Sequence, residues 1–208
     1  MEDFRTLKAV QLDALREVAN IGAGHAATAL STMTGSRVEI SVPTINIARL
    51  EDVPPQISGP EEPVAAVLMK IFGDLAGHAL LVFPTPTALR MAELMARKPR
   101  GTWSELGALQ QSAIQEAGNI LSGAYVNALS EFMEMIIMIS PPSLAVDMSA
   151  AVLTTAYLQF PSSTKPDYVV CVESEFYMKD SDEHLRGFFL LLPDMDSLTK
   201  ILRVLRVG

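Results

Sequence analysis

A stretch of 31 residues, numbers 13–43, reads DALREVANIGAGHAATALSTMTGSRVEISVP, and a second stretch at 112–142 reads SAIQEAGNILSGAYVNALSEFMEMIIMISPP. Aligned without gaps at an offset of 99 residues, the two stretches share eleven identities. The identical positions are Ala14/Ala113, Glu17/Glu116, Asn20/Asn119, Ile21/Ile120, Gly24/Gly123, Ala29/Ala128, Leu30/Leu129, Ser31/Ser130, Ile40/Ile139, Ser41/Ser140 and Pro43/Pro142. Two copies with so long a period are too few for a solenoid, so the sequence predicts a duplicated unit with pseudo-two-fold symmetry.

Each copy is expected to begin as a helix and to end as a strand. In the first copy, apolar residues recur at spacings of three and four, which predicts the buried face of an amphipathic helix. These residues are Leu12, Leu15, Ala19, Ala23, Ala26 and Leu30. Beyond Gly35 the apolar residues Val38, Ile40 and Val42 alternate with others, which is typical of a strand with one covered face. A long helix therefore leads into a sheet.

Apolar and β-branched runs in the rest of the chain predict further strands, most of which alternate enough to suit an antiparallel sheet. The runs lie at 64–72, 77–83, 151–160, 167–177 and 186–192. Helical spacing predicts a helix at 85–98 and its counterpart at 194–207. The proline-rich segment 51–63 is expected to be a surface loop, and 179–183 a solvated hairpin turn.

The fold class that these elements predict is α+β. We expect a pseudo-two-fold duplicated α/β unit in which long helices cover a largely antiparallel sheet and carry the functional sites. At 208 residues the chain has the length of one domain, residues 1–208, with a first half at 1–100 and a second half at 101–208. The boundary is marked by Pro99-Arg100-Gly101-Thr102, which ends one helix before the second copy begins.

Composition narrows the possible classes of function. The 16 Lys and Arg residues against 24 Asp and Glu residues give a net charge of −8, which argues against a nucleic-acid partner. Apolar runs such as 188–192 and 135–139 are far shorter than the roughly 20 residues that cross a bilayer, so no membrane insertion is expected. The single cysteine, Cys171, and the absence of a leader favour a cytoplasmic setting, with Cys171 in the core.

A polar stripe is predicted along the helix of each copy. At about 100° per residue, an acid or serine, a glutamate, an asparagine and a glycine fall on one side of each helix, away from its apolar face. They are Asp13, Glu17, Asn20 and Gly24 in the first copy and Ser112, Glu116, Asn119 and Gly123 in the second. The glutamate and the asparagine recur while neighbouring surface positions differ, which indicates that these two side chains act together.

Common descent alone is an alternative origin of the repeated stripe. Glutamate is a good helix former and asparagine is tolerated, so an exposed pair would persist in both copies without any function. The glycine costs about 1 kcal/mol relative to alanine inside a helix, and it fits either close packing against another helix or room for a partner. A metal site is not expected, because His25, His78 and His184 are far apart in the sequence and the chain has one cysteine.

The two stripes resemble the paired signature of the CheC phosphatases of bacterial and archaeal chemotaxis. The matching residues are Asp13, Glu17, Asn20 and, after 22 residues, Pro43, and again Ser112, Glu116, Asn119 and, after 22 residues, Pro142. The segment 17–29, EVANIGAGHAATA, and the two-copy arrangement extend the resemblance over nearly the whole chain. Both motifs are intact, whereas the related CheX type is expected to keep one. The FliY type carries a further switch domain, for which this length is expected to leave no room.

The resemblance implies an enzyme, a phosphoaspartyl-protein phosphatase that hydrolyses the aspartyl phosphate of a CheY-type response regulator. Asn20 and Asn119 would orient the attacking water, since an amide accepts and donates hydrogen bonds but takes no proton at neutral pH. Glu17 and Glu116 would pair with the active-site lysine of the regulator, which the resemblance implies as well.

The remaining expectations concern supporting residues and partners. Asp13 and Ser112 differ in type at the first motif position, which predicts a supporting or docking role. The Mg²⁺ for the reaction is expected in the phosphorylated regulator, so that this chain binds no cofactor. The resemblance also implies a complex with CheD, the receptor-modifying deamidase, and a CheD-binding adaptor with weak or no catalysis is the alternative function. A flagellar-switch component is a third possibility, and the expected state is a pseudo-symmetric monomer.

Overall fold

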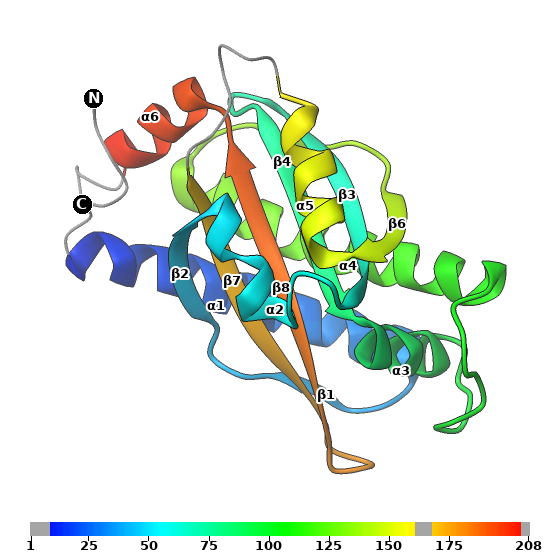
Figure 1. The fold of residues 1–208 in the computed structure, drawn as a ribbon. Helices are drawn as coiled ribbons and strands as arrows, with labels where there is room; N and C mark the ends of the chain where they lie inside the picture. Colours follow the sequence, from blue (N-terminus) through cyan, green and yellow to red (C-terminus); the bar gives the residue numbers. More distant parts are fainter. Residues whose placement is uncertain (1–8, 161–167, 205–208) are drawn as a thin grey trace.

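A computed structural model describes residues 9–160 and 168–204, and the same order of elements runs through them twice (Figure 1). The first series is α1 (Ala9–Thr34), β1 (Val38–Ile40), β2 (Thr44–Arg49), the 3-10 helix η2 (Leu50–Asp52), α2 (Pro54–Ile57), β3 (Pro63–Gly73), β4 (Gly77–Pro84) and α3 (Thr85–Met95). The second series is α4 (Ala108–Met133), β5 (Ile137–Ile139), β6 (Ser143–Met148), α5 (Ser149–Leu158), β7 (Tyr168–Met178), β8 (Glu183–Pro193) and α6 (Met195–Val204).

The strands of both series form one antiparallel sheet, whose main path runs β1-β7-β8-β4-β3-β5. The hairpins β3–β4 and β7–β8 meet at its centre, where β4 pairs with β8 from Gly77↔Pro193 to Val82↔Phe188. The short strands cross between the series, because β1 and β2 pair with β7 whereas β5 and β6 pair with β3. Each series therefore completes the sheet of the other, and the predicted α+β class with a largely antiparallel sheet is confirmed.

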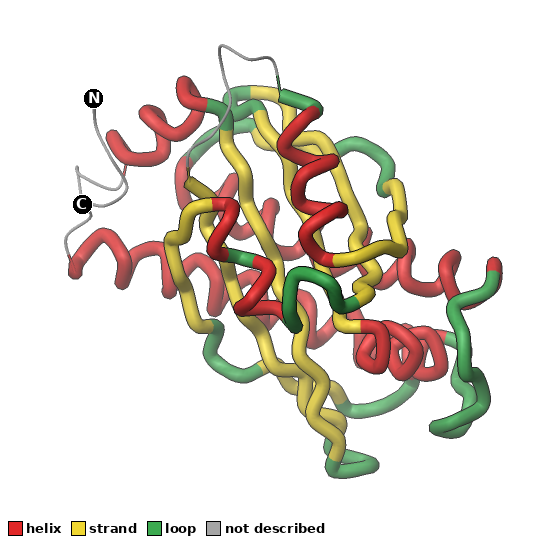
Figure 2. The backbone as a smooth tube through the Cα atoms, viewed as in Figure 1, coloured by secondary structure: helices red, strands yellow, loops and turns green. Residues whose placement is uncertain are grey.

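Helices cover both faces of the sheet (Figure 2). The apolar residues of the sheet are divided between two cores, one on each face. The long helices α1 and α4 pack together on one face, and α2 and α5 lie on the other. Along β4, Ala79, Leu81 and Phe83 belong to the core under α1 and α4, whereas Leu80 and Val82 belong to the core under α2 and α5. Because side chains alternate along a strand, an unbroken apolar run fills both cores.

Two glycines bring the long helices close to their neighbours. A Cβ atom at Gly22 of α1 would lie 2.8 Å from Cδ1 of Tyr125 on α4, and one at Gly118 of α4 would lie 2.6 Å from Cγ2 of Val67 on β3. Tyr125 in turn stacks on Phe189 of β8, with 5.0 Å between the ring centroids. Glycine thus sets how closely α1 approaches α4 and how deeply α4 sits on the sheet.

Several predicted elements are confirmed. The predicted inward face of α1 is buried from Leu15 to Leu30, with Leu12 half-buried. The break at 99–102 lies between α3 and α4, and the hairpin turn lies between β7 and β8. The helix predicted at 194–207 is α6, and its last predicted residues fall outside the described ones. Among the helices that the structure describes, none combines the length and apolarity needed to span a bilayer.

Two local predictions are wrong. The segment 151–160, predicted as a strand, lies almost entirely in the helix α5, whose buried residues Val152, Leu153 and Ala156 share one helical face against the second core. The segment 51–63, predicted as a surface loop, contains the short helix α2, and it buries Val53 and Ile57 in the same core. Both errors concern the same face of the sheet, where short helices replace a strand and a loop.

Candidate active site

All six predicted site residues are exposed on the two long helices, while their neighbours Val18 and Ala117 are buried. Asp13, Glu17 and Asn20 lie on α1, and Ser112, Glu116 and Asn119 lie on α4. Within each helix, the glutamate and the asparagine are three residues apart and therefore neighbours on adjacent turns. In the described part of the chain, no hydrogen bond or ion pair engages the side chains of either pair. Their carboxylate and amide groups are available to another molecule.

Several identities between the two copies are explained by packing inside the molecule. Leu30 and Leu129 are buried in the core beneath the long helices. Ser31 ties the end of α1 to β1, and Ser130 ties the end of α4 to the connection that leads to β5. The backbone N–H of Val38 donates to Ser31 Oγ at 3.0 Å, and Ser130 Oγ donates to the backbone carbonyl of residue 135. These identities preserve the fold and say nothing about a site.

The motif prolines lie at the corner between the two short strands of each series. Pro43 is buried between β1 and β2, and Pro142 is half-buried between β5 and β6. Just before them, the N–H groups of Ser41 and Ser140 donate to carbonyls of neighbouring chain segments, both at 2.9 Å. Proline has no N–H to continue such pairing, and its φ is fixed. The position of the two prolines therefore suits a role in shaping the backbone corner.

Glycine at Gly24 and Gly123 has no internal explanation. A Cβ atom at either position would meet no atom within 4 Å, so the alternative of close helix packing is wrong for these two glycines. Neither residue has a positive φ, and each costs about 1 kcal/mol of helix stability relative to alanine. Among the polar and glycine identities, the glutamate, the asparagine and the glycine of the stripe are thus the ones that no contact inside the described chain accounts for.

The two sites differ in the turn that precedes the asparagine. At the first site, Arg16 Nη1 donates to Asp13 Oδ1 at 2.7 Å, and both side chains are more than half exposed, so the ion pair contributes little to stability. At the second site, Gln115 is the counterpart of Arg16, and its Nε2 donates to the carbonyl of Pro142 at 3.1 Å. One site therefore carries an ion pair beside Glu17, and the other carries a neutral hydrogen bond. Sequence patterns do not single out Arg16 and Gln115, because the two copies disagree there.

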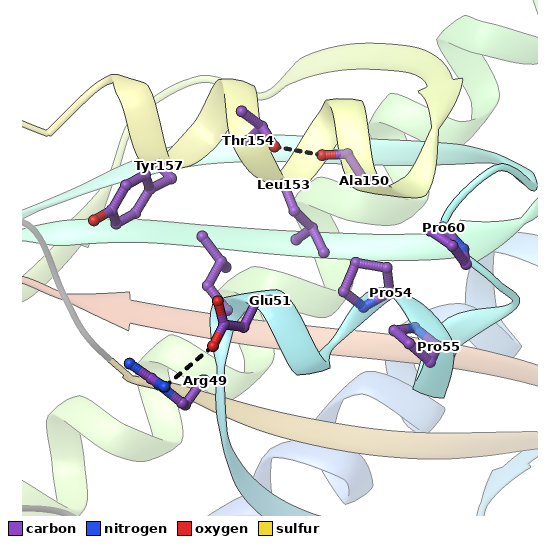
Figure 3. Close-up of a pocket in the computed structure, with 10 residues that line it drawn as sticks. Arg49, Glu51, Pro54, Pro55, Pro60, Ala150, Leu153, Thr154 and Tyr157 are labelled. Carbon is purple, nitrogen blue, oxygen red and sulfur yellow. Dashed lines mark hydrogen bonds and ion pairs between the residues drawn. The ribbon is translucent and has the colours of Figure 1, made fainter.

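Two hollows lie away from the stripes. A groove of about 540 Å³ opens between α2 and α5, on the face of the sheet opposite α1 and α4 (Figure 3). At its edge, Arg49 Nη1 lies 3.2 Å from Glu51 Oε1. A second hollow, of about 560 Å³, adjoins the ion pair of Arg90 with Glu183. Nowhere in the described residues do three His, Cys, Asp or Glu side chains gather as metal ligands would.

The charged side chains beside the second hollow pair with one another and form a network inside the fold. Arg90 Nη2 lies 2.7 Å from Glu183 Oε2, and Arg90 Nη1 lies 3.3 Å from Oε2 of the buried Glu93. Glu93 Oε1 also accepts the backbone N–H of Trp103 at 3.1 Å. Burial acts to raise the pKa of the Glu183 carboxyl, but hydrogen bonds from Arg90 and Ser181 and nearby arginine charges outweigh burial, so this pKa lies below its usual value. The network holds the α3–α4 connection against β8.

Comparison with known proteins places both copies in one family. The model of the CheC-like family matches residues 10–47 and 109–146, which contain the helix and the strand of each copy. The CheY-P phosphatase CheC of Bacillus subtilis is 29% identical over 203 residues, which is 97% of this chain and 96% of that protein. The flagellar motor switch phosphatase FliY of the same species is 32% identical over 140 residues, which is 65% of this chain and 35% of that protein.

Comparison of the fold with solved structures finds a protein of the same group. The crystal structure of Thermotoga maritima FliY matches with a TM-score of 0.77 and 25% sequence identity, over 97% of this chain and 98% of that chain. The family match thus falls on the two stripe-bearing helices, and the likeness to CheC extends over nearly the full length. Both copies of the repeat thus match the CheC-like family.

Proposed function

We propose that this protein is a phosphoaspartyl-protein phosphatase that hydrolyses the aspartyl phosphate of a CheY-type response regulator. The observation that carries the proposal is the pair of glutamate and asparagine, present on each long helix, exposed, and without partners inside the described chain. The relatives named as a CheY-P phosphatase and a switch phosphatase support the same class of substrate.

Asn20 and Asn119 act by orienting water. The amide oxygen accepts a hydrogen bond from the attacking water, and the amide NH₂ donates to an oxygen of the phosphoryl group. As the bond from the water oxygen to phosphorus forms, the bond from phosphorus to the aspartyl oxygen breaks, and aspartate leaves as a carboxylate. An amide takes no proton at neutral pH, so the proton of the water passes to phosphate or solvent. A loose transition state needs placement more than a strong base.

The regulator supplies the other parts of the reaction. Its Mg²⁺ and its lysine neutralise the charge on the phosphoryl oxygens, so the proposal assigns no metal or cofactor to this chain. This chain then needs to contribute only a helix surface that presents one amide and one carboxylate. This division of labour agrees with the exposure of the glutamate and the asparagine on both helices.

Glu17 and Glu116 dock the regulator. Because each lies three residues before an asparagine, their Cβ atoms are about 5–6 Å apart on the helix surface. A carboxylate in this place forms a charge-assisted hydrogen bond with the lysine of the regulator, which fixes the register of the amide over the phosphoryl group. Asp13 and Ser112, one turn earlier, extend the docking surface, and at the first site Asp13 is already paired with Arg16.

Phosphate release tests this proposal. A phosphorylated CheY-type regulator in Mg²⁺ is measured alone, with the native protein, and with the Asn20→Ala/Asn119→Ala double variant. Asn127→Ala is the matched control, because Asn127 is an exposed asparagine of α4 about 12 Å beyond Asn119. We expect acceleration by the native protein and by the control, and none by the folded double variant.

The alternative is an adaptor that binds and regulates CheD with weak or no catalysis. It predicts that the native protein accelerates phosphate release weakly or not at all, equally with or without Asn20 and Asn119, and that it captures purified CheD equally well in both forms. This outcome would overturn the phosphatase proposal.

A further inference from the structure

Gly24 and Gly123 occupy equivalent places beyond the two asparagines. Each lies four residues after Asn20 or Asn119, which is about 6 Å further along the helix axis. Each also lies ten residues before the last residue of its helix, so neither serves as a helix cap. Gly24 is exposed and Gly123 is half-buried, and both belong to the polar stripe.

The ordinary reasons for a helical glycine are absent at both positions. A positive φ, which only glycine adopts without strain, is found at neither. Close packing is also absent, because an added Cβ atom would meet nothing within 4 Å at either position. The contrast with Gly22 and Gly118 is sharp, since a Cβ atom there would lie 2.8 Å and 2.6 Å from neighbouring atoms.

A need for a free backbone carbonyl does not explain Gly24 either. Its carbonyl already accepts a hydrogen bond from Thr28 Oγ at 3.0 Å, besides its place in the helix. Glycine leaves the surface of the helix backbone uncovered at this position. Within the described residues no atom occupies the space above it, which leaves room for a molecule outside the chain.

The direction of a helical side chain connects this space to the asparagine. In an α-helix every Cα–Cβ bond tilts toward the N-terminus, so a side chain covers the turn before its own residue. A methyl group at position 24 would therefore project toward the turn that carries Asn20. At position 123 it would project in the same way toward Asn119.

We propose that Gly24 and Gly123 are positioning residues of the phosphatase site, an inference that rests on the proposed function. The missing side chain lets the backbone around the aspartyl phosphate of the regulator seat directly on the helix. In this seat the amide one turn earlier reaches the attacking water. A side chain added at either position would keep the phosphoryl group away from the amide.

The experiment replaces both glycines by alanine in one variant and by leucine in another. Alanine and leucine have nearly the same helix propensity, so both variants stiffen the helices equally, and only their size differs. We expect each alanine to raise the midpoint of thermal unfolding by about 2–4 °C. We also expect the alanine variant to lose at least tenfold in kcat/KM toward a phosphorylated CheY-type regulator, and the leucine variant to lose more.

Thr32→Ala is the control, because Thr32 is exposed on α1 two turns beyond Gly24 and alanine there also favours the helix. This control should raise the midpoint and leave kcat/KM unchanged. Equal losses of kcat/KM in the alanine and leucine variants would show that helix rigidity causes the effect. An unchanged kcat/KM in both would show that the two glycines persist through shared ancestry alone. Either result overturns the inference while the phosphatase activity stands. A native protein without activity refutes the proposed function itself.

Discussion

Adding one methyl group to Gly118 should disturb the second site through packing alone. Gly118 precedes Asn119 and rests on Val67 of β3, which is fully buried. The new Cβ atom would lie 2.6 Å from Cγ2 of Val67 and 2.7 Å from its Cβ and Cγ1. Carbon atoms in contact are about 3.5–4.0 Å apart, so α4 must lift from the sheet by roughly 1 Å near Asn119, or Val67 must move.

The expected costs differ for stability and for activity. Overpacking of this kind costs about 1–3 kcal/mol, and alanine returns about 1 kcal/mol through helix propensity. The net loss of about 0–2 kcal/mol lowers the unfolding midpoint of a chain of this size by a few degrees, at about 2–4 °C per kcal/mol. A displacement of about 1 Å at a positioning group costs up to about a hundredfold in rate. Gly118→Ala should therefore lose much more activity than stability.

The activity of the second site is measured alone by making every variant in a protein that carries Asn20→Ala. Phosphate release and thermal unfolding are compared for this parent, for added Gly118→Ala, for added Val67→Ala and for both together. Val67→Ala removes Cγ1 and Cγ2, two of the three atoms that the new methyl meets, and keeps Cβ. The pair should therefore restore part of the activity and should be more stable than the sum of single effects allows, by about 0.5–3 kcal/mol. Additive effects without any restored activity would refute this seating of α4 on the sheet.

Three further outcomes are expected. Glu17→Gln and Glu116→Gln together should raise KM for the phosphorylated regulator at least tenfold with little change in the unfolding midpoint; an unchanged KM would remove their docking role. The pKa of Glu183 is lowered in the fold, so its stabilisation is present above the ordinary glutamate pKa and is lost as pH falls through the folded value. Glu183→Gln should therefore flatten the fall in unfolding free energy between about pH 5 and pH 3, and an equally steep fall would contradict the ion-pair assignment. Burial raises the pKa of the Cys171 thiol to about 12, so a thiol-alkylating reagent at pH 8 should label it only after unfolding, and rapid labelling of the folded protein would contradict its burial.

Much of the architecture follows from local patterns. The offset of 99 residues predicts two equivalent long helices, and the spacing of three and four predicts which face of α1 is buried, from Leu15 to Leu30. Apolar and β-branched runs predict the hairpin strands, because a strand between two cores places apolar side chains on both sides. The same angular reasoning places Glu17 and Asn20 on the exposed side before any tertiary contact is known.

Other features depend on contacts between distant segments. The helix α5 carries an apolar run that suits either a strand or a buried helix, and only the second core beneath it decides in favour of the helix. The exchange of β1, β2, β5 and β6 between the two series is a matter of topology, which no local pattern records. Likewise, nothing near Gly22 or Gly24 in the sequence tells which glycine meets Tyr125 and which meets open space.

In the proposed mechanism, Asn20 and Asn119 place the attacking water at two separate sites. Its most direct test is the rate of phosphate release from one phosphorylated CheY-type regulator with the native protein, with Asn20→Ala, with Asn119→Ala and with both substitutions together. Each asparagine is exposed, so all three variants should unfold within a degree or two of the native protein. We expect each single variant to keep the activity of the intact site and the double variant to fall to the regulator's own rate. A folded double variant that still accelerates release as the native protein does would contradict the claim.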